Sequence, residues 1–177
     1  MATAKQALSW VKEHFNSGDH KRKYETDEGS NTVITKMSLR NQLESTSIFI
    51  ECHEVYICVR AYINIRVDKK HRQSVAEYLA RANADNPFCY FNMNYDIGRI
   101  WTQMALICHG MNSLPVEVFN RTFYAPASML ELYGNGLLAV MSGVKTPKEA
   151  ITDIGRESGC SCGCSHDYDT GHEDNSE

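Results

Sequence analysis

The residues best suited to chemistry lie near the end of the sequence, in the segment GCSCGCSHDYDTGH. Cys160, Cys162 and Cys164 stand at alternate positions, and His166 follows two residues later. Thiolate and imidazole groups are ligands of Zn²⁺, Cu⁺ and iron–sulfur clusters rather than of Mg²⁺ or Ca²⁺. If this segment binds a metal, we expect Zn²⁺ or Cu⁺ held by Cys160, Cys162, Cys164 and His166.

The same segment has a second interpretation, an acidic tail with incidental thiols. A structural zinc site usually has a C-x₂-C pair matched by a second pair of ligands, and this sequence has no C-x₂-C pair. From Ser165 to Glu177 there are five acidic residues and no Lys or Arg. We favour the tail, which requires no cofactor. We therefore divide the chain into an α+β domain at 1–157 and a Cys-rich acidic tail at 158–177, which we expect to be disordered.

The rest of the sequence carries no recognisable catalytic motif. It has no G-x-S-x-G, Walker loop, dinucleotide fingerprint or H-E-x-x-H. Gly134-Asn135-Gly136 lacks the preceding strand and the following Lys-Ser or Lys-Thr of a phosphate loop, so we interpret it as a weak point in a helix. His53 and His109 could meet near Cys52 or Cys108, but ordinary packing is the simpler interpretation. We expect no catalytic residues and a protein that is not an enzyme.

The composition indicates one ordinary globular domain. Of the 177 residues, 42% are hydrophobic and 23% are charged. No apolar run approaches the roughly 20 residues of a membrane-spanning helix, and the first residues lack a secretory signal, so we expect a cytoplasmic protein with no membrane partner. Outside the acidic segment from Ser165, the chain has 18 basic and 17 acidic residues. This balance gives no strong positive field, and we expect no nucleic-acid partner.

Hydrophobic spacing predicts a helix and then three strands in the first part of the chain. Four apolar residues recur at steps of four and three on one helical stripe: Ala4, Leu8, Val11 and Phe15. The polar stretch 16–31 has no periodicity and is expected to be a loop. Alternating apolar residues then predict strands at 32–40, 47–52 and 55–67. In the third strand, Arg60, Asn64 and Arg66 fall on the face opposite the apolar residues.

The second part of the chain predicts a helix, two strands and two more helices. The helix runs from about Asp68 to Asn86, and strands at 89–95 and 99–108 flank a turn that ends at Gly98. A long helical pattern follows, with a kink or break expected at Pro126. Thr146 to Glu149 spells a capping box for a last helix. Adjacent strands predict an α+β fold, a five-stranded antiparallel sheet with helices packed on one face.

The sequence also predicts whether two groups of residues in these strands are buried or lie on the surface. Four cysteines lie in apolar runs and are expected to be small buried side chains, as in a reducing compartment: Cys52, Cys58, Cys89 and Cys108. Five aromatic residues could form a protein contact on a solvent-facing side of the sheet: Tyr56, Tyr62, Tyr90, Phe91 and Trp101. The alternative for the aromatic residues is burial beneath a helix.

The order of elements carries a resemblance to a known family. It consists of a helix ending near Asn83 or Asn86, a strand, a turn ending in Gly98, a strand of alternating apolar residues, and a Pro-containing helix with a restart at Thr146 to Ala150. The segment from Val75 to Ile151 resembles in these features the YbjN-like proteins, described as bacterial sensory transduction regulators, which share the fold of type III secretion chaperones. The preceding strands agree with that topology.

The resemblance implies a small cytoplasmic protein, often a homodimer, whose surface holds another polypeptide. It implies no catalytic residues and does not include the cysteine segment. We therefore expect a non-enzymatic protein-interaction or regulatory module that binds a segment of another polypeptide. The alternative is a metal- or thiol-handling protein that acts through Cys160, Cys162, Cys164 and His166.

Overall fold

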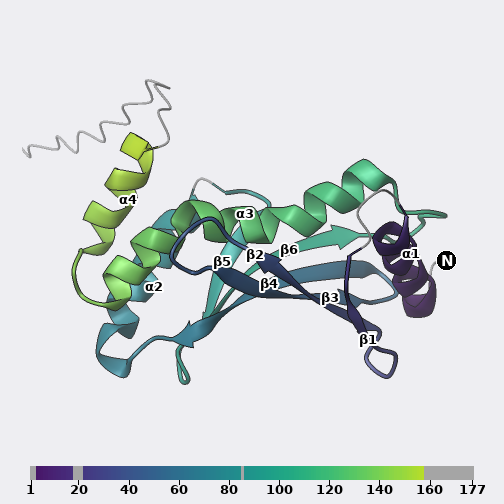
Figure 1. Cartoon of the computed structure of the whole chain (residues 1–177), viewed down its shortest axis with the longest axis horizontal. Helices are drawn as coiled ribbons and strands as arrows, with labels where there is room; N and C mark the ends of the chain where they lie inside the picture. Colours follow the sequence, from purple (N-terminus) through teal and green to yellow (C-terminus); the bar gives the residue numbers. More distant parts are fainter. Residues whose placement is uncertain (1–2, 18–21, 85, 158–177) are drawn as a thin grey trace, which may run out of the picture.

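The computed structural model describes residues 3–17, 22–84 and 86–157. These residues form an α+β fold with a six-stranded antiparallel sheet and four α-helices (Figure 1). The strands are β1 (Glu25–Asp27), β2 (Thr32–Ser38), β3 (Ser45–Cys52), β4 (Tyr56–Arg66), β5 (Cys89–Asn94) and β6 (Arg99–Ile107). The helices are α1 (Ala4–Asn16), α2 (Arg72–Ala84), α3 (Val116–Met141) and α4 (Pro147–Glu157), and a 3₁₀ turn at Lys69–His71 precedes α2.

The strand order is β1-β2-β3-β4-β6-β5, and every neighbouring pair is antiparallel. The five predicted strands are confirmed, but the five-strand count was wrong because β1 lies inside the stretch 16–31 that we expected to be a loop. Its three residues are polar and have no apolar alternation, so no local pattern marks them. Their strand conformation depends on pairing with Thr32, Val33 and Ile34 of β2.

Helices α1, α2 and α3 pack on one face of the sheet, as predicted, and α4 packs on α2 and α3. Each strand turns alternate side chains toward them, which is the pleat of a strand covered on one side. Val33, Ile50, Val59 and Ile100 are almost completely buried on this side and belong to the main core. α1 and α3 lie along the same side of the sheet, and α2 and α4 lie at the end opposite α1 (Figure 1).

The long helix α3 runs without a break from Val116 to Met141, although Pro126 lies inside it. We expected a kink or a break at Pro126, and the helix has no break there. A proline in a helix costs about 3 kcal/mol, and the burial of Phe123, Ala127 and Leu130 on either side offsets this cost. The hydroxyl of Thr102 on β6 also donates a hydrogen bond of 2.7 Å to the Pro126 carbonyl, which attaches the helix to the sheet.

The two glycines of α3 serve close packing rather than a helix break. A Cβ atom at Gly134 would lie 2.4 Å from Nδ2 of Asn41, in the loop between β2 and β3. A Cβ atom at Gly136 would lie 2.5 Å from the Tyr78 hydroxyl oxygen, on α2. Both positions therefore need a residue without a side chain, and the helix continues through them.

The predicted capping box at the start of α4 is confirmed. The hydroxyl oxygen of Thr146 accepts a hydrogen bond of 3.3 Å from the amide of Glu149, and the Glu149 carboxylate accepts one of 2.9 Å from the amide of Thr146. None of the helices in the described ranges is long and apolar enough to cross a membrane.

Candidate functional site

The predicted metal ligands Cys160, Cys162, Cys164 and His166 lie outside the described residues, so the metal site stays a prediction. Within residues 3–17, 22–84 and 86–157, no three His, Cys, Asp or Glu side chains are grouped closely enough to hold a metal ion.

His53 and His109 make packing contacts near the β3–β4 turn. The ring of His53 stacks on the ring of Tyr56 with centroids 4.4 Å apart, and its carbonyl lies 3.9 Å from the thiol of Cys108. The backbone amide of His109 donates to the carbonyl of Val55. These contacts join the β3–β4 turn to the end of β6, and among the described residues no hydrogen bond or ring contact joins the two imidazoles.

Cys52, Cys58 and Cys89 lie in strands and Cys108 follows β6, and all four are buried free thiols, as predicted for their packing. Burial raises the pKa of Cys52 and of Cys89 to about 12, and it also raises the pKa of Cys58 and of Cys108. A nucleophilic cysteine needs a lowered pKa, because the thiolate is the reactive form. These side chains therefore act as small core residues.

The sheet face opposite the helices, which we call the open face, carries a row of aromatic rings. Phe49 on β3, Tyr62 on β4 and Trp101 on β6 are half-buried. The ring centroids of Phe49 and Tyr62 are 5.3 Å apart in an edge-to-face contact, and those of Tyr62 and Trp101 are 5.8 Å apart. The row thus crosses three strands without a helix above it in the described part of the chain.

Most of the predicted surface aromatic residues lie on this face. Tyr62 pairs with Trp101 across β4 and β6, and Tyr56 and Tyr90 occupy the same side of their strands and are exposed. Phe91 is the exception: it is 3% exposed, faces the helices, and contacts Tyr133 of α3 edge to face. The alternative of burial beneath a helix holds for Phe91. The neighbouring Asn92 pairs with Trp101 and lies on the open face, so Phe91 points to the opposite face.

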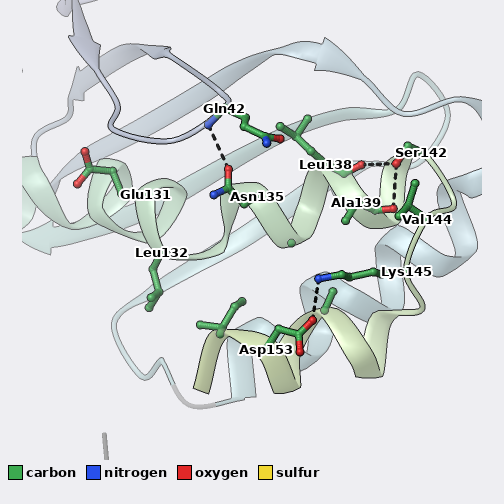
Figure 2. Close-up of a pocket in the computed structure, with 13 residues that line it drawn as sticks. Gln42, Glu131, Leu132, Asn135, Leu138, Ala139, Ser142, Val144, Lys145 and Asp153 are labelled. Carbon is green, nitrogen blue, oxygen red and sulfur yellow. Dashed lines mark hydrogen bonds and ion pairs between the residues drawn. The ribbon is translucent and has the colours of Figure 1, made fainter. Parts of the chain in front are cut away.

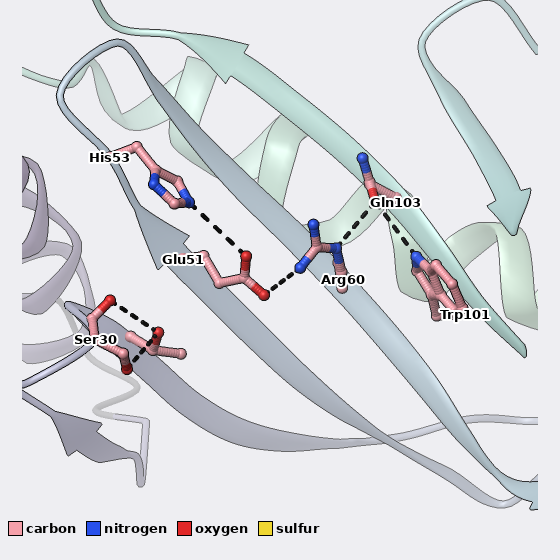
Figure 3. A network of polar contacts seen from close by, with 7 residues as sticks. Ser30, Glu51, His53, Arg60, Trp101 and Gln103 are labelled. Carbon is pink, nitrogen blue, oxygen red and sulfur yellow. Dashed lines mark hydrogen bonds and ion pairs between the residues drawn. The ribbon is translucent and has the colours of Figure 1, made fainter. Parts of the chain in front are cut away.

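A chain of polar contacts runs beside the aromatic row (Figure 3). The guanidinium of Arg60 forms an ion pair with Glu51 and donates a hydrogen bond of 3.0 Å to the side-chain oxygen of Gln103. The indole N–H of Trp101 donates to the same oxygen over 3.3 Å, and the carboxylate of Glu51 lies 3.8 Å from the imidazole of His53. The chain joins β3, β4 and β6 and holds the Trp101 and Arg60 side chains in place.

A cavity of about 390 Å³ lies at one end of the aromatic row. Its lining combines the two rings with polar and cationic side chains, and consists of Ser47, Phe49, Tyr62, Ile63, Asn64, Arg66 and Arg99. Arg66 and Arg99 are direct partners across β4 and β6, and the guanidinium of Arg99 lies 5.3 Å from the Tyr62 ring centroid. The period-two pattern of 55–67 places Arg66 on this face, whereas its pairing with Arg99 depends on strand register.

A groove of about 790 Å³ lies elsewhere, between α3, α4 and the loop that joins β2 to β3 (Figure 2). Its polar side chains bind within the chain: the amide of Gln42 donates to the side-chain oxygen of Asn135, and Lys145 forms an ion pair of 2.7 Å with Asp153. These contacts attach the loop to α3 and the residue before α4 to the second turn of that helix. The groove thus lies between elements whose polar side chains already bind one another.

No model of a known protein family matches the chain, and no curated protein matches it in sequence.

Proposed function

We propose that this chain is a non-enzymatic protein-interaction module that binds a segment of another polypeptide on the open face of its sheet. The observation that supports it is the half-buried row of Phe49, Tyr62 and Trp101, which no described helix covers. Large aromatic side chains are enriched in protein interfaces and provide most of the binding energy at their centres.

The polar chain beside the row favours binding, because it holds the surface in one arrangement before a partner arrives. Trp101 and Arg60 share the oxygen of Gln103, and Glu51 holds the other side of the Arg60 guanidinium. Side chains that are already ordered lose less conformational entropy on association. A bound segment would lie over the rings and use the exposed side chains around them for polar contacts.

We further propose that the chain belongs to the YbjN-like family and has the type III secretion chaperone-like fold. The supporting observation is the order of elements from α1 to α4, with strands β2 to β4 before α2 and strands β5 and β6 after it. The family resemblance implies a homodimer. Sedimentation velocity on the full chain tests it: a species of about twice 20.0 kDa is expected, and a monomer at all concentrations would contradict the dimer.

Site-specific crosslinking on the full-length protein tests the binding face. A photo-crosslinking residue in place of Tyr62 or Trp101 should capture the same polypeptide segment, identified by mass spectrometry, while one in place of Leu132 should not. Leu132 is the matched control because it is an exposed apolar residue on α3, away from the open face. Tyr62→Ala should then abolish capture from the Trp101 position, with the far-ultraviolet circular dichroism unchanged.

Other results of that experiment would contradict the proposal. Capture at Leu132 alone would move binding to the groove between α3 and α4. Because aromatic residues on a sheet also stack on the bases of single-stranded nucleic acids, a labelled deoxythymidine oligomer serves as a second probe. Its binding, lost in Tyr62→Ala, would replace the polypeptide with a nucleic acid.

The second candidate function is metal or thiol handling by Cys160, Cys162, Cys164 and His166, and the alternate spacing of three cysteines in the sequence favours it. Metal content by mass spectrometry tests it on the full chain. Zinc or copper that co-purifies with the protein should be absent when Cys160, Cys162 and Cys164 are replaced by Ser. Equal metal in both proteins would exclude this function.

A further inference from the structure

The cavity at the end of the aromatic row contains two arginines whose positions need an explanation. Arg66 and Arg99 lie directly opposite each other on β4 and β6. Like charges in directly opposed positions destabilise a sheet unless another group neutralises them. In the part of the chain that the structure describes, no carboxylate forms an ion pair with either guanidinium.

The nearby Arg60 differs from Arg66 and Arg99 because its charge is neutralised within the chain. It lies on the same face of β4, but Glu51 neutralises its charge and Gln103 accepts from its Nε. Arg99 instead lies over the ring of Tyr62, a contact that orients the guanidinium without neutralising it. The open face thus has one arginine bound inside the polar chain and two that retain their capacity to bind an anion.

The backbone around the pair is built to hold it. The register of β4 against β6 shifts between Tyr62 and Arg66, and such irregularities redirect side chains next to functional sites. The amide of Val67 donates a hydrogen bond of 2.9 Å to the carbonyl of Gly98, which joins the end of β4 to the β5–β6 turn. Gly98 has a φ of +67°, and a Cβ atom there would lie 2.3 Å from the Val67 carbonyl oxygen, so the close approach needs glycine.

Another arginine, Arg72 at the start of α2, binds this turn. The guanidinium of Arg72 donates to the carbonyl of Asp96 over 2.8 Å and to the carbonyl of Val67 over 3.3 Å. The β5–β6 turn is therefore tied both to the end of β4 and to α2. Since Arg66 and Arg99 adjoin these tied residues, their backbones are held at a fixed separation before any ligand binds.

We propose that Arg66 and Arg99 form a carboxylate-binding site for an acidic segment of a partner polypeptide, with Tyr62 and Phe49 as the wall for its apolar neighbours. The planar guanidinium fork matches a carboxylate in two parallel hydrogen bonds, and Ser47 and Asn64 supply further polar groups in the cavity. The charge complementarity selects an acidic partner, and the rings select one with aromatic or aliphatic residues beside the acidic ones. This inference rests on the proposed function, because the ligand is a polypeptide on the same face.

The test measures binding to the full-length protein by fluorescence anisotropy with two labelled peptides. One has alternating Glu and Phe residues in a Gly-Ser background, and the other has Gln in place of every Glu. The Glu peptide should bind at least about tenfold more tightly, and Arg66→Gln with Arg99→Gln should remove that difference. Arg40→Gln with Arg121→Gln changes the net charge equally, at two exposed residues outside the cavity, and should leave it in place.

A conservative variant separates the fork geometry from simple charge. Arg66→Lys with Arg99→Lys keeps both positive charges and should restore only part of the affinity, because an ammonium cannot form the paired hydrogen bonds. Thermal unfolding of each variant shows whether it is folded. Full restoration by Lys would overturn the fork, since a simple positive field would then be enough.

Three further results would overturn the partner proposal, each in a distinguishable way. If both peptides bind equally and only Tyr62→Ala weakens them, the carboxylate site is excluded while the proposed function stands. If neither peptide binds and the crosslinking at Tyr62 and Trp101 also fails, the proposed function is excluded with it. The third result concerns a variant in which the five acidic residues of 165–177 are replaced by amides. If this variant binds the Glu peptide about tenfold more tightly than the native protein does, the occupant is this chain's own segment.

Discussion

The side-chain amide of Asn83 on α2 binds both backbone groups of Phe91 on β5. Its Oδ1 atom accepts a hydrogen bond of 2.7 Å from the Phe91 amide, and its Nδ2 atom donates one of 3.0 Å to the Phe91 carbonyl. Since the amide and carbonyl of one strand residue point to the same side, Asn83 occupies the outer edge of β5 where another strand would pair. The Asn83 side chain thus blocks the pairing of another strand at this position of β5.

Replacing Asn83 should expose this edge. Asn83→Ala leaves a part-buried amide and carbonyl without partners, so we expect a loss of about 1–3 kcal/mol in the free energy of unfolding by urea. The variant should also self-associate more at high concentration, measured by light scattering. Gln73→Ala, at an exposed position of the same helix, is the control and should change neither. Unchanged stability in Asn83→Ala would contradict the capping role.

The close approach of Gly98 to Val67 predicts an unequal effect of two glycine substitutions. Gly98 and Gly110 both have a positive φ, at +67° and +80°, but only Gly98 has backbone atoms where a Cβ would lie. Gly110→Ala should cost about 1–2 kcal/mol from backbone strain alone. Gly98→Ala should cost more, because the Val67 carbonyl must also move. Equal midpoints of chemical unfolding for the two variants would refute the packing argument.

The contact between Gly136 and Tyr78 predicts a coupled pair of mutations. The Tyr78 hydroxyl donates a buried hydrogen bond of 2.7 Å to the Tyr133 carbonyl, so Tyr78→Phe should cost about 1 kcal/mol. Gly136→Ala should destabilise the native protein, because its Cβ would lie against that hydroxyl. In the Tyr78→Phe background the same change should be much less harmful, since alanine favours a helix by about 1 kcal/mol over glycine. Additive losses in a double-mutant cycle would exclude the coupling.

The buried thiols predict slow alkylation. A pKa of about 12 for Cys52 and Cys89, in place of the ordinary 9.0, lowers the thiolate fraction at neutral pH about a thousandfold, and burial blocks the reagent as well. Peptide mapping after brief treatment with iodoacetamide should find little modification of Cys52, Cys58, Cys89 and Cys108 until urea is added. Rapid labelling of any of them in the folded protein would show that its strand opens in solution.

The capping box predicts a pH dependence at the start of α4. The backbone amide of Thr146, and then its hydroxyl, hold the pKa of Glu149 below its ordinary value of 4.5. A carboxylate with a lowered pKa stabilises the folded state above its ordinary pKa, and this contribution is lost as the pH falls through the lower value. A carbon-13 titration should place the pKa of Glu149 below 4.5, and Thr146→Ala should raise it part of the way toward 4.5, because the hydroxyl is removed while the backbone amide remains. An unchanged titration in Thr146→Ala would contradict the pairing.

The local features of this fold could be predicted because they depend on residues close in sequence. The stripe of Leu8, Val11 and Phe15 is buried in α1, and the alternation of 55–67 became the central strand β4. The capping box needs only Thr146 and Glu149, three positions apart. In each case the hydrogen bonds or the buried face arise within one element, so the residue pattern contains the information.

The open face could be predicted only in part. Alternation indicated that Tyr62 and Trp101 lie on a surface of the sheet, and the structure shows them in contact. Phe91 was grouped with them although it faces the core, because the pattern of a short strand does not state which of its sides is covered. The strand β1 and the unbroken helix through Pro126 likewise depend on distant partners, β2 and Thr102.

The residue pattern predicts an α+β chain of amphipathic helices and alternating strands, with Arg66 on the polar side of the longest strand. That Arg66 lies opposite Arg99, beside the ring of Tyr62, is known from the folded chain alone. The physical reason is that strand register is selected by the whole sheet and by the Gly98–Val67 contact. Residues more than thirty positions apart carry no local signal of the neighbour that they will meet.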